Sequence, residues 1–261
     1  MAALDYAVAE HIATITLNRP ERLNTISREM LDELCVMLNR ANEDADVRVI
    51  VLTGTGRAFC AGLDLNEAAS GEGIGTGSRF AATLDLRNTP PTVLHAIDKP
   101  VICALNGSAA GYGMDLALGC DIRIMAAEAK LAAAFVKRGV VPESGGTWFL
   151  PRMLGWAKAS EIIFTGRTLS AAECLAEGLA NVVVPADQVQ AEARRMAAEI
   201  AANAPLAVTS AKRMMRMGLE ETFPTHVQHV YLQLLPLFAS DDFQEGIKSF
   251  LEKRPAQFTG R

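Results

Sequence analysis

Residues 101–116 read VICALNGSAAGYGMDL, and this stretch decides the predicted fold. Its first five residues, Val101 to Leu105, are the apolar and β-branched residues of a buried strand. Glycines then stand at positions 107, 111 and 113, where a helix can begin. At a helix start the backbone N–H groups have no intrahelical partner, and glycine lets a ligand approach them closely. The stretch therefore predicts a strand, a turn with outward-facing N–H donors, and a helix.

A second stretch repeats this design. Residues 47–52 form another β-branched run, and residues 56–65 follow it as GRAFCAGLDL. Two such turns that face each other would place two N–H donors around one anion. The spacing does not fit a dinucleotide fingerprint, because Leu116 stands where the third glycine is needed, and no Gly-Lys-Ser/Thr triplet marks a P-loop. Pro142, two residues before Ser144, rules out a nucleophile elbow.

The remaining chain alternates strand and helix patterns until about residue 188. Strands are predicted at 6–9, 12–17 and 122–125, and Ser27 and Ser170 are predicted to cap helices. This alternation predicts an α/β fold with repeated strand-strand-helix units.

Beyond residue 188 the pattern is helical over 188–203, 205–217, 222–238 and 241–253. These helices carry a surplus of apolar residues that either packs on the parent core or forms a subunit interface. The surplus consists of Met214, Met215, Met217, Val227, Val230, Leu232, Leu234, Leu235, Leu237 and Phe238. We therefore divide the chain into an α/β core, 1–195, and a helical region, 196–261.

The composition excludes several classes of protein. The net charge is −5 with no Lys/Arg cluster, so we expect no nucleic-acid partner. No apolar run reaches the ~20 residues of a membrane span, and the start of the chain does not resemble a signal peptide. The five cysteines, scattered without a CxxC pair, indicate a reduced cytoplasmic protein. His226 and His229 are three residues apart, but with no further ligand near in sequence we expect no metal.

One segment has no packing pattern. Glycines alternate at positions 71, 73, 75 and 77 within residues 66–88. This predicts a loop, which is either a mobile lid over the site or a passive surface loop.

Five ordered blocks resemble the enoyl-CoA hydratase/isomerase family, also called the crotonase family, over essentially the whole chain. The blocks are residues 18–24, 58–65, 106–121, 142–147 and 245–254. The resemblance implies a crotonase-like spiral fold and an acyl-CoA substrate. It implies no separate cofactor, because coenzyme A is part of the substrate. It also implies assembly into homotrimers or dimers of trimers, with the 196–261 region between subunits and in contact with CoA.

The resemblance also assigns roles to backbone and CoA-binding residues. The N–H groups of Leu63 and Tyr112 would form an oxyanion hole, the pair of donors that stabilises a thioester enolate. Ala58 to Ala61 would pack near adenine. Phe250 and Lys253 would contact CoA, with Lys253 near a phosphate of its own or a neighbouring subunit. The alternative for Lys253 is a solvated cation at a helix end.

The acids depart from the hydratase pattern. Hydratases of the family use two glutamates to hold the water that adds to the double bond. Here Asp115 occupies the first of these positions. Phe135 occupies the second, and its ring would shape the acyl pocket. Glu143 lies where some family isomerases carry an acid. We therefore hypothesise that Glu143 is the principal acid/base.

Alternatives remain for both carboxylates. Glu143 could instead cap the helix that begins near Ser144. Asp115 could orient a water or a substrate group, assist Glu143, or be a hydrogen-bonded helix residue. Three functions follow: an isomerase that uses Glu143, a hydratase that uses Asp115 and Glu143, or a non-catalytic acyl-CoA-binding protein.

Overall fold

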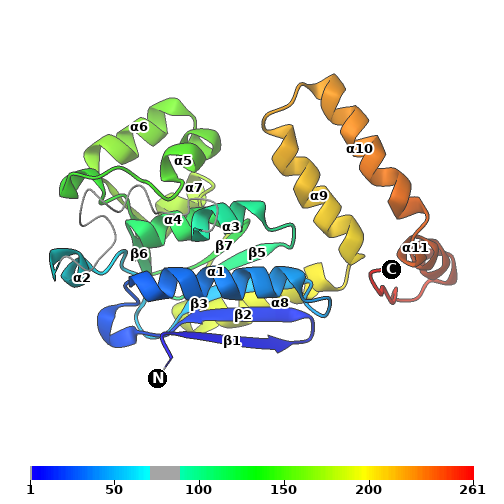
Figure 1. Cartoon of the computed structure of the whole chain (residues 1–261), viewed down its shortest axis with the longest axis horizontal. Coiled ribbons are helices and arrows are strands. Elements are labelled where there is room, and N and C mark those ends of the chain that lie inside the picture. The colour runs from blue at the N-terminus through cyan, green and yellow to red at the C-terminus, as the bar shows by residue number, and fades with distance from the viewer. Residues whose placement is uncertain (1, 71–88) are drawn as a thin grey trace.

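The computed structural model describes residues 2–70 and 89–261, as two sheets covered by helices (Figure 1). The loop predicted over 66–88 is wrong at its start, because residues 66–70 belong to the helix α2, Leu65–Ser70, and residues 71–88 lie outside the described residues. The strands are β1 Leu4–Ala9, β2 Ile12–Leu17, β3 Val49–Gly54, β4 Ala58–Cys60, β5 Val101–Leu105, β6 Ser108–Ala110, β7 Ile122–Ala126, β8 Lys130–Ala132, β9 Thr168–Ser170 and β10 Val182–Val184.

The main sheet has the order β1-β2-β3-β5-β7-β10. β1 and β2 form the predicted antiparallel hairpin, and the other neighbours run parallel. The hairpin turns at Glu10 and His11, which both have positive φ, as tight hairpin turns require. Every residue of β3 and β5 is buried, because helices and the hairpin enclose strands at the centre of the sheet.

The second sheet has the order β4-β6-β8-β9 and strands of three residues. In the chain, β4 follows β3, β6 follows β5 and β8 follows β7, and each pair leads towards a helix. The strand-strand-helix repeat is therefore confirmed. This repeat matters for function because the turns that lead from the strands of the second sheet into helices lie side by side.

Eleven α-helices and three short 3-10 helices complete the described chain. They are α1 Arg28–Glu43, α2 Leu65–Ser70, α3 Pro90–Ala96, α4 Tyr112–Gly119, α5 Gly146–Leu154, α6 Trp156–Thr165, α7 Ala171–Ala176, α8 Val189–Ala201, α9 Pro205–Gly218, α10 Phe223–Phe238, α11 Asp241–Glu252, η1 Pro20–Arg22, η3 Val136–Arg138 and η4 Ala186–Gln188. Ser27 and Ser170 cap α1 and α7 as predicted. None of the described helices combines the length and apolarity of a bilayer span.

The last three helices form an arm that projects from the body (Figure 1). α8, which spans the predicted division at residue 195, still belongs to the body, because Val189, Ala193, Ala197 and Ala201 bury one face of it. In contrast, α10 buries none of its residues. The apolar residues of α10 therefore do not pack on the core of this chain.

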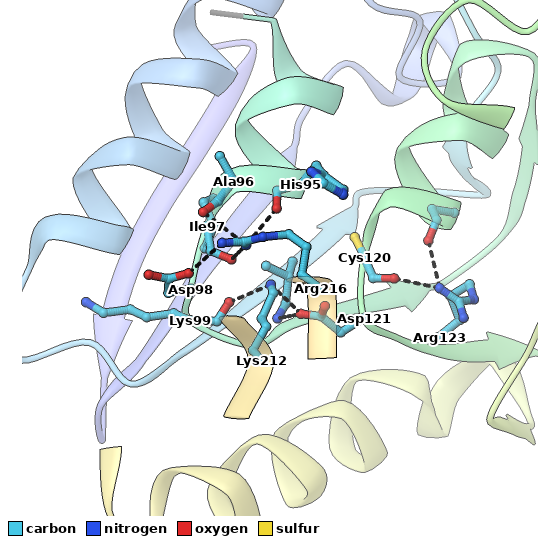
Figure 2. A network of polar contacts seen from close by, with 12 residues as sticks. His95, Ala96, Ile97, Asp98, Lys99, Cys120, Asp121, Arg123, Lys212 and Arg216 are labelled. Carbon is cyan, nitrogen blue, oxygen red and sulfur yellow. Dashed lines mark hydrogen bonds and ion pairs between the residues drawn. The ribbon is translucent and has the colours of Figure 1, made fainter. Parts of the chain in front are cut away.

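Charged contacts attach the arm to the body (Figure 2). Arg216 of α9 donates to the backbone oxygen of His95, 2.8 Å away, and to Oδ1 of Asp98, 2.9 Å away. Lys212 of α9 donates to Oδ2 of Asp121 at 2.7 Å. Burial raises the pKa of Asp98, but hydrogen bonds from Arg213 and Arg216 outweigh it and hold that pKa below its usual value.

Candidate active site

Two glycine turns meet where β4 and β6, neighbouring strands of the second sheet, end. Gly62 has φ +106°, and a Cβ there would lie 3.0 Å from the oxygen of Ala110 and 3.7 Å from the nitrogen of Tyr112. A Cβ on Gly113 would lie 2.2 Å from the oxygen of Cys60, closer than real atoms approach. The turn after β4 and the turn after β6 are therefore adjacent, and they can be so only because glycines line the contact.

The amides of Leu63 and Tyr112 are both available at this meeting point. Leu63 forms a parallel bridge with Ile26, in which Ile26 donates to Gly62 and accepts from Asp64. Both bonds flank Leu63, so its own N–H points away from Ile26. Tyr112 is the first residue of α4, where an N–H has no helical acceptor. Within residues 2–70 and 89–261 neither amide donates to a protein acceptor. Their role as oxyanion donors stays a prediction.

Helix α4 is held firmly at both ends. Its residues from Tyr112 to Leu118 are buried, and Gly111 just before it donates to Ala132 at 3.0 Å. At the other end, the buried Arg123 donates to the backbone oxygen of Cys120 at 2.6 Å (Figure 2) and to that of Leu179 at 2.5 Å. Burial lowers the pKa of Arg123. A cation at this end complements the helix dipole, whose positive end lies at Tyr112.

Asp115 is a buried carboxyl between α4 and α5. Its side chain is 1% exposed, and its Oδ2 accepts the amide of Ser144 at 3.1 Å. A Cβ on Gly146 would lie 2.4 Å from Oδ1, so the carboxyl lies against the start of α5. Oδ1 has no hydrogen bond within the described chain. Burial raises the pKa of Asp115 to about 7, the charge of Glu143 adds to the rise, and the amides of Gly146 and Ser144 oppose it.

We expect Asp115→Asn to change how stability depends on pH. Because the folded pKa is about 7 and the ordinary value 3.8, the native state holds the Asp115 proton more tightly than the unfolded chain does. Its contribution to the free energy of unfolding is therefore fully present below pH ~4 and falls as pH rises to ~7, by up to about 4 kcal/mol. Denaturant unfolding of both proteins across this range measures the difference. A constant difference between them would contradict the raised pKa.

Glu143 lies beside the same helix but is exposed. It precedes α5, and Ser144 Oγ donates to its Oε1 at 3.4 Å. The negative charge of Glu143 contributes to the raised pKa values of Asp115 and Tyr112, so it lies near the N-terminus of α4. α5 begins after Gly145 without a side-chain cap, so the structure gives the capping role of Glu143 no hydrogen bond among described residues.

Ser144 is the site residue that sequence reasoning missed. It is 3% exposed, and it contacts both candidate carboxylates. Its amide donates to Asp115, and its hydroxyl contacts Glu143. Burial raises the pKa of Tyr112, and the side chain of Ser144 opposes that rise. The one sequence feature that points to Ser144 is its position next to Glu143 at a Gly-rich helix start.

The predicted CoA contacts are divided between two parts of the chain. Ala58 begins β4 and is buried, whereas Ala61 just after β4 is exposed. Phe250 is 82% exposed on α11, and Lys253 caps that helix in a left-handed conformation. Figure 1 shows α11 on the opposite side of the molecule from β6. One chain therefore does not bring Phe250 and Lys253 to the Ala58–Ala61 segment.

Phe135 lies between β8 and η3. It is 5% exposed, so the ring is enclosed by protein. Because β8 pairs with β6, the chain before Phe135 runs beside the strand that leads into the Tyr112 turn. This placement is compatible with the pocket role of Phe135, which stays a prediction.

One further expectation needs correction. His226 and His229 do have a carboxylate nearby, because the oxygens of Glu221 contact their Nδ1 atoms at 3.1 and 2.6 Å. Trp156 is 76% exposed in the single chain. Asp64 forms an ion pair with Arg19 at 3.1 Å, which stabilises the loop between β4 and α2.

Comparison with known proteins agrees with this geometry. The family described as enoyl-CoA hydratase/isomerase matches residues 7–261. Relatives include 1,2-epoxyphenylacetyl-CoA isomerase of Escherichia coli, 38% identical over 97% of both chains, and 2,3-dehydroadipyl-CoA hydratase of the same organism, 34% identical over 100% of both. The crystal structure of enoyl-CoA hydratase from Bacillus anthracis superposes with a TM-score of 0.92 at 35% identity, covering 100% of both chains. The chain belongs to the enoyl-CoA hydratase/isomerase family and is an enzyme that acts on acyl-CoA.

Proposed function

We propose that this enzyme moves the double bond of an enoyl-CoA, with Glu143 as the single acid/base. The carboxylate of Glu143 removes a proton from C2 of the thioester, and the electrons form a dienolate. The same group, now protonated, returns the proton at C4. The proton count balances within the substrate, so no cofactor is needed beyond the CoA that the substrate carries.

The enolate oxygen would accept hydrogen bonds from the amides of Leu63 and Tyr112. The support is that both N–H groups lack a partner in the described chain and belong to adjacent turns. Each preorganised donor of this kind contributes about 3–4 kcal/mol to the transition state. The buried Arg123 at the far end of α4 fixes the helix that carries Tyr112.

The difference in exposure between Glu143 and Asp115 is the observation that favours isomerisation over hydration. Glu143 is open to a bound substrate, whereas Asp115 is 1% exposed and engaged by the Ser144 amide. A pair of acids that hold one water needs both to face the same open space. Phe135 in the second glutamate position removes the other partner of that pair. The arrangement therefore supports one working carboxylate.

Hydration remains the second candidate, because Glu143 raises the pKa of Asp115 and the two carboxyls must be near each other. The relatives also include a hydratase and an isomerase at similar identity. In this alternative Asp115 and Glu143 together would hold the water that adds to a 2-enoyl-CoA.

The test is to offer the purified protein one series of 3-enoyl-CoA and 2-enoyl-CoA thioesters and follow both reactions. Isomerisation predicts conversion of 3-enoyl to 2-enoyl thioester, with deuterium entering C2 and C4 in heavy water. Faster formation of 3-hydroxyacyl-CoA would overturn the proposal in favour of hydration. Binding without turnover or exchange would instead indicate an acyl-CoA-binding protein.

We further propose that the α9–α11 arm forms the interface of a homotrimer or a dimer of trimers. An apolar groove of about 550 Å³ lies between its helices, and Phe250 and Leu251 in its lining are more than half exposed. We expect this exposed apolar surface to be covered by another subunit. Phe250 and Lys253 would then reach CoA in a neighbouring site. A monomeric mass in sedimentation equilibrium would contradict this assembly.

A further inference from the structure

We propose that Arg19 and Asp64 are positioning residues that hold the backbone N–H of Leu63 in the direction of the thioester oxygen. This inference rests on the proposed function, in which the Leu63 amide is one of two oxyanion donors. It deepens that function by naming the side chains that aim the donor. It does not depend on which carboxylate moves the proton.

The first support is how little else fixes the turn that carries Leu63. The bridge between Ile26 and Leu63 is isolated, so no longer ladder of strand pairs sets its direction. Its two bonds run from the Ile26 amide to the oxygen of Gly62 at 2.8 Å and from the Asp64 amide to the oxygen of Ile26 at 3.0 Å. Gly62, just before Leu63, has φ +106°, a conformation in which glycine leaves the chain free to rotate. A further contact is therefore needed to keep the Leu63 amide in one direction.

The ion pair supplies that contact by joining the two segments of the bridge. Nη2 of Arg19 donates to Oδ2 of Asp64 at 3.1 Å, and Nη1 donates to the backbone oxygen of Thr25 at 3.0 Å. Thr25 precedes Ile26 and Asp64 follows Leu63, so one guanidinium spans both segments. Because the guanidinium is planar and its donors are at fixed angles, it also fixes how far apart the segments lie.

The carboxylate of Asp64 is held at both oxygens. Its side chain is 4% exposed, and its Oδ1 accepts the amide of Asn66 in the first turn of α2 at 3.2 Å. Burial raises the pKa of Asp64, but the hydrogen bonds from Asn66 and Arg19 outweigh it and hold that pKa below its usual value. An ionised carboxylate with a donor on each oxygen has no freedom to rotate. The backbone of Asp64, and with it the preceding Leu63, is therefore fixed to Arg19.

Arg19 is itself anchored to the strand that leads into Leu63. Its amide donates to Oδ1 of Asn24 at 2.8 Å, and Nδ2 of Asn24 donates to the oxygen of Ala58 in β4 at 2.8 Å. Leu23 and Asn24 both have φ +54°, a left-handed conformation that is strained for leucine and persists only where the surroundings enforce it. The buried Asn24 provides that enforcement. The turn from Arg19 to Asn24 therefore acts as a rigid frame for the ion pair.

The consequence should fall on kcat more than on KM. A donor stabilises the enolate only if it is already aimed at the oxygen that gains charge. A turn that can rotate still admits the CoA thioester, but its amide is misdirected when charge develops. A displacement of about 1 Å in a positioned group can cost about 10²-fold in rate.

The first measurement is steady-state kinetics on 3-enoyl-CoA. In Asp64→Asn the new NH₂ group must face one of the donors that the carboxylate accepted, so we expect kcat to fall about 10- to 10²-fold with KM within about threefold. Arg19→Lys keeps the charge but loses the fork, so kcat should fall about three- to tenfold. It leaves Asp64 paired, so it keeps the test valid if Asp64→Asn does not fold. If Asp64 acted only as a cap of α2, Arg19→Lys would have no effect.

The two substitutions should not add, because the two side chains act as one unit. We expect the double variant to have a kcat within about twofold of Asp64→Asn alone. Losses that multiply would contradict a joint role of the pair.

The second measurement does not depend on the reaction. A saturated acyl-CoA carrying ¹³C at the thioester carbonyl is bound, and its C=O stretch is followed by infrared difference spectroscopy. Hydrogen bonds to the oxygen weaken the C=O bond and lower this frequency. We expect the lowering seen in the wild type to be reduced by about half in Asp64→Asn, because one of two donors is misdirected.

Glu173→Gln is the matched control, since it removes the carboxylate of the ion pair between Arg167 and Glu173 on α7. It should leave both kcat and the carbonyl frequency unchanged. Wild-type kcat in folded Asp64→Asn and Arg19→Lys would overturn the inference. A lower kcat with an unchanged carbonyl frequency would overturn it too, because the pair would then be merely structural.

Failure of the proposed function gives a different result. A wild type that lowers the carbonyl frequency but adds water instead of moving the double bond would overturn isomerisation and leave the role of the ion pair to the infrared comparison. A wild type that leaves the carbonyl frequency unshifted would contradict the donor role of Leu63, and this inference would be overturned with it.

Discussion

Glu143→Gln lowers the rate of double-bond migration by about 10²- to 10⁴-fold, the range that a positioned acid/base contributes. Glutamine keeps the size and polarity of the side chain and can still accept from Ser144, but it cannot take a proton. Binding of a saturated acyl-CoA should stay within about twofold, because the CoA contacts and backbone donors are unchanged. Steady-state kinetics and equilibrium binding measure the two quantities.

The control for this substitution is Glu128→Gln, which neutralises an exposed glutamate in the turn between β7 and β8. It should leave the rate of migration near that of the wild type. Residual migration in Glu143→Gln at more than about a tenth of the wild-type rate would remove Glu143 as the principal base. The family assignment would stand, since it does not depend on that side chain.

Gly113→Ala should have the second large effect, on both stability and rate. The new Cβ would lie 2.2 Å from the oxygen of Cys60 and 2.7 Å from its Cβ. Neither the strand β4 nor the helix α4 can yield easily, because both are buried. We expect a loss of about 3 kcal/mol or more in the free energy of unfolding, at the upper end for overpacked cores.

The rate should fall because the same clash separates the two predicted oxyanion donors. Loss of one such donor costs about 10²- to 10³-fold in kcat, so the folded fraction of Gly113→Ala should lose at least that much. Gly119→Ala is the control within the same helix, since its Cβ would meet only Leu94 Cδ1 at 3.3 Å and side chains beyond. Wild-type kcat in folded Gly113→Ala would show that the β4–α4 contact does not set the donor geometry.

Local sequence predicted the regular elements well. The run Val101–Leu105 is β5 to the residue, and Ser27 and Ser170 cap the helices predicted for them. These features depend on neighbours along the chain, so periodicity and capping patterns suffice. The run predicted at 47–52 is displaced by two residues, to Val49–Gly54, because pairing with β2 and β5 sets its ends.

The three-residue strands of the second sheet were not predictable in the same way. β4, β6, β8 and β9 are too short for periodicity, and they exist because strands distant in sequence pair with them. The link between Glu221 and the two histidines of α10 was missed for a related reason. Its contacts depend on how the turn between α9 and α10 folds back, which no local pattern specifies.

The sequence by itself determined the α/β fold, the family and the positions where backbone N–H groups would be left without partners. It did so because strand and helix patterns, glycine turns and ordered motif blocks are all local properties. Only the tertiary structure decided that Asp115 is enclosed, that Glu143 is open and that Ser144 touches both. Exposure and hydrogen bonding of a side chain depend on which distant segments pack around it, and packing brings residues 112–115 and 143–146 together across about 30 positions of chain.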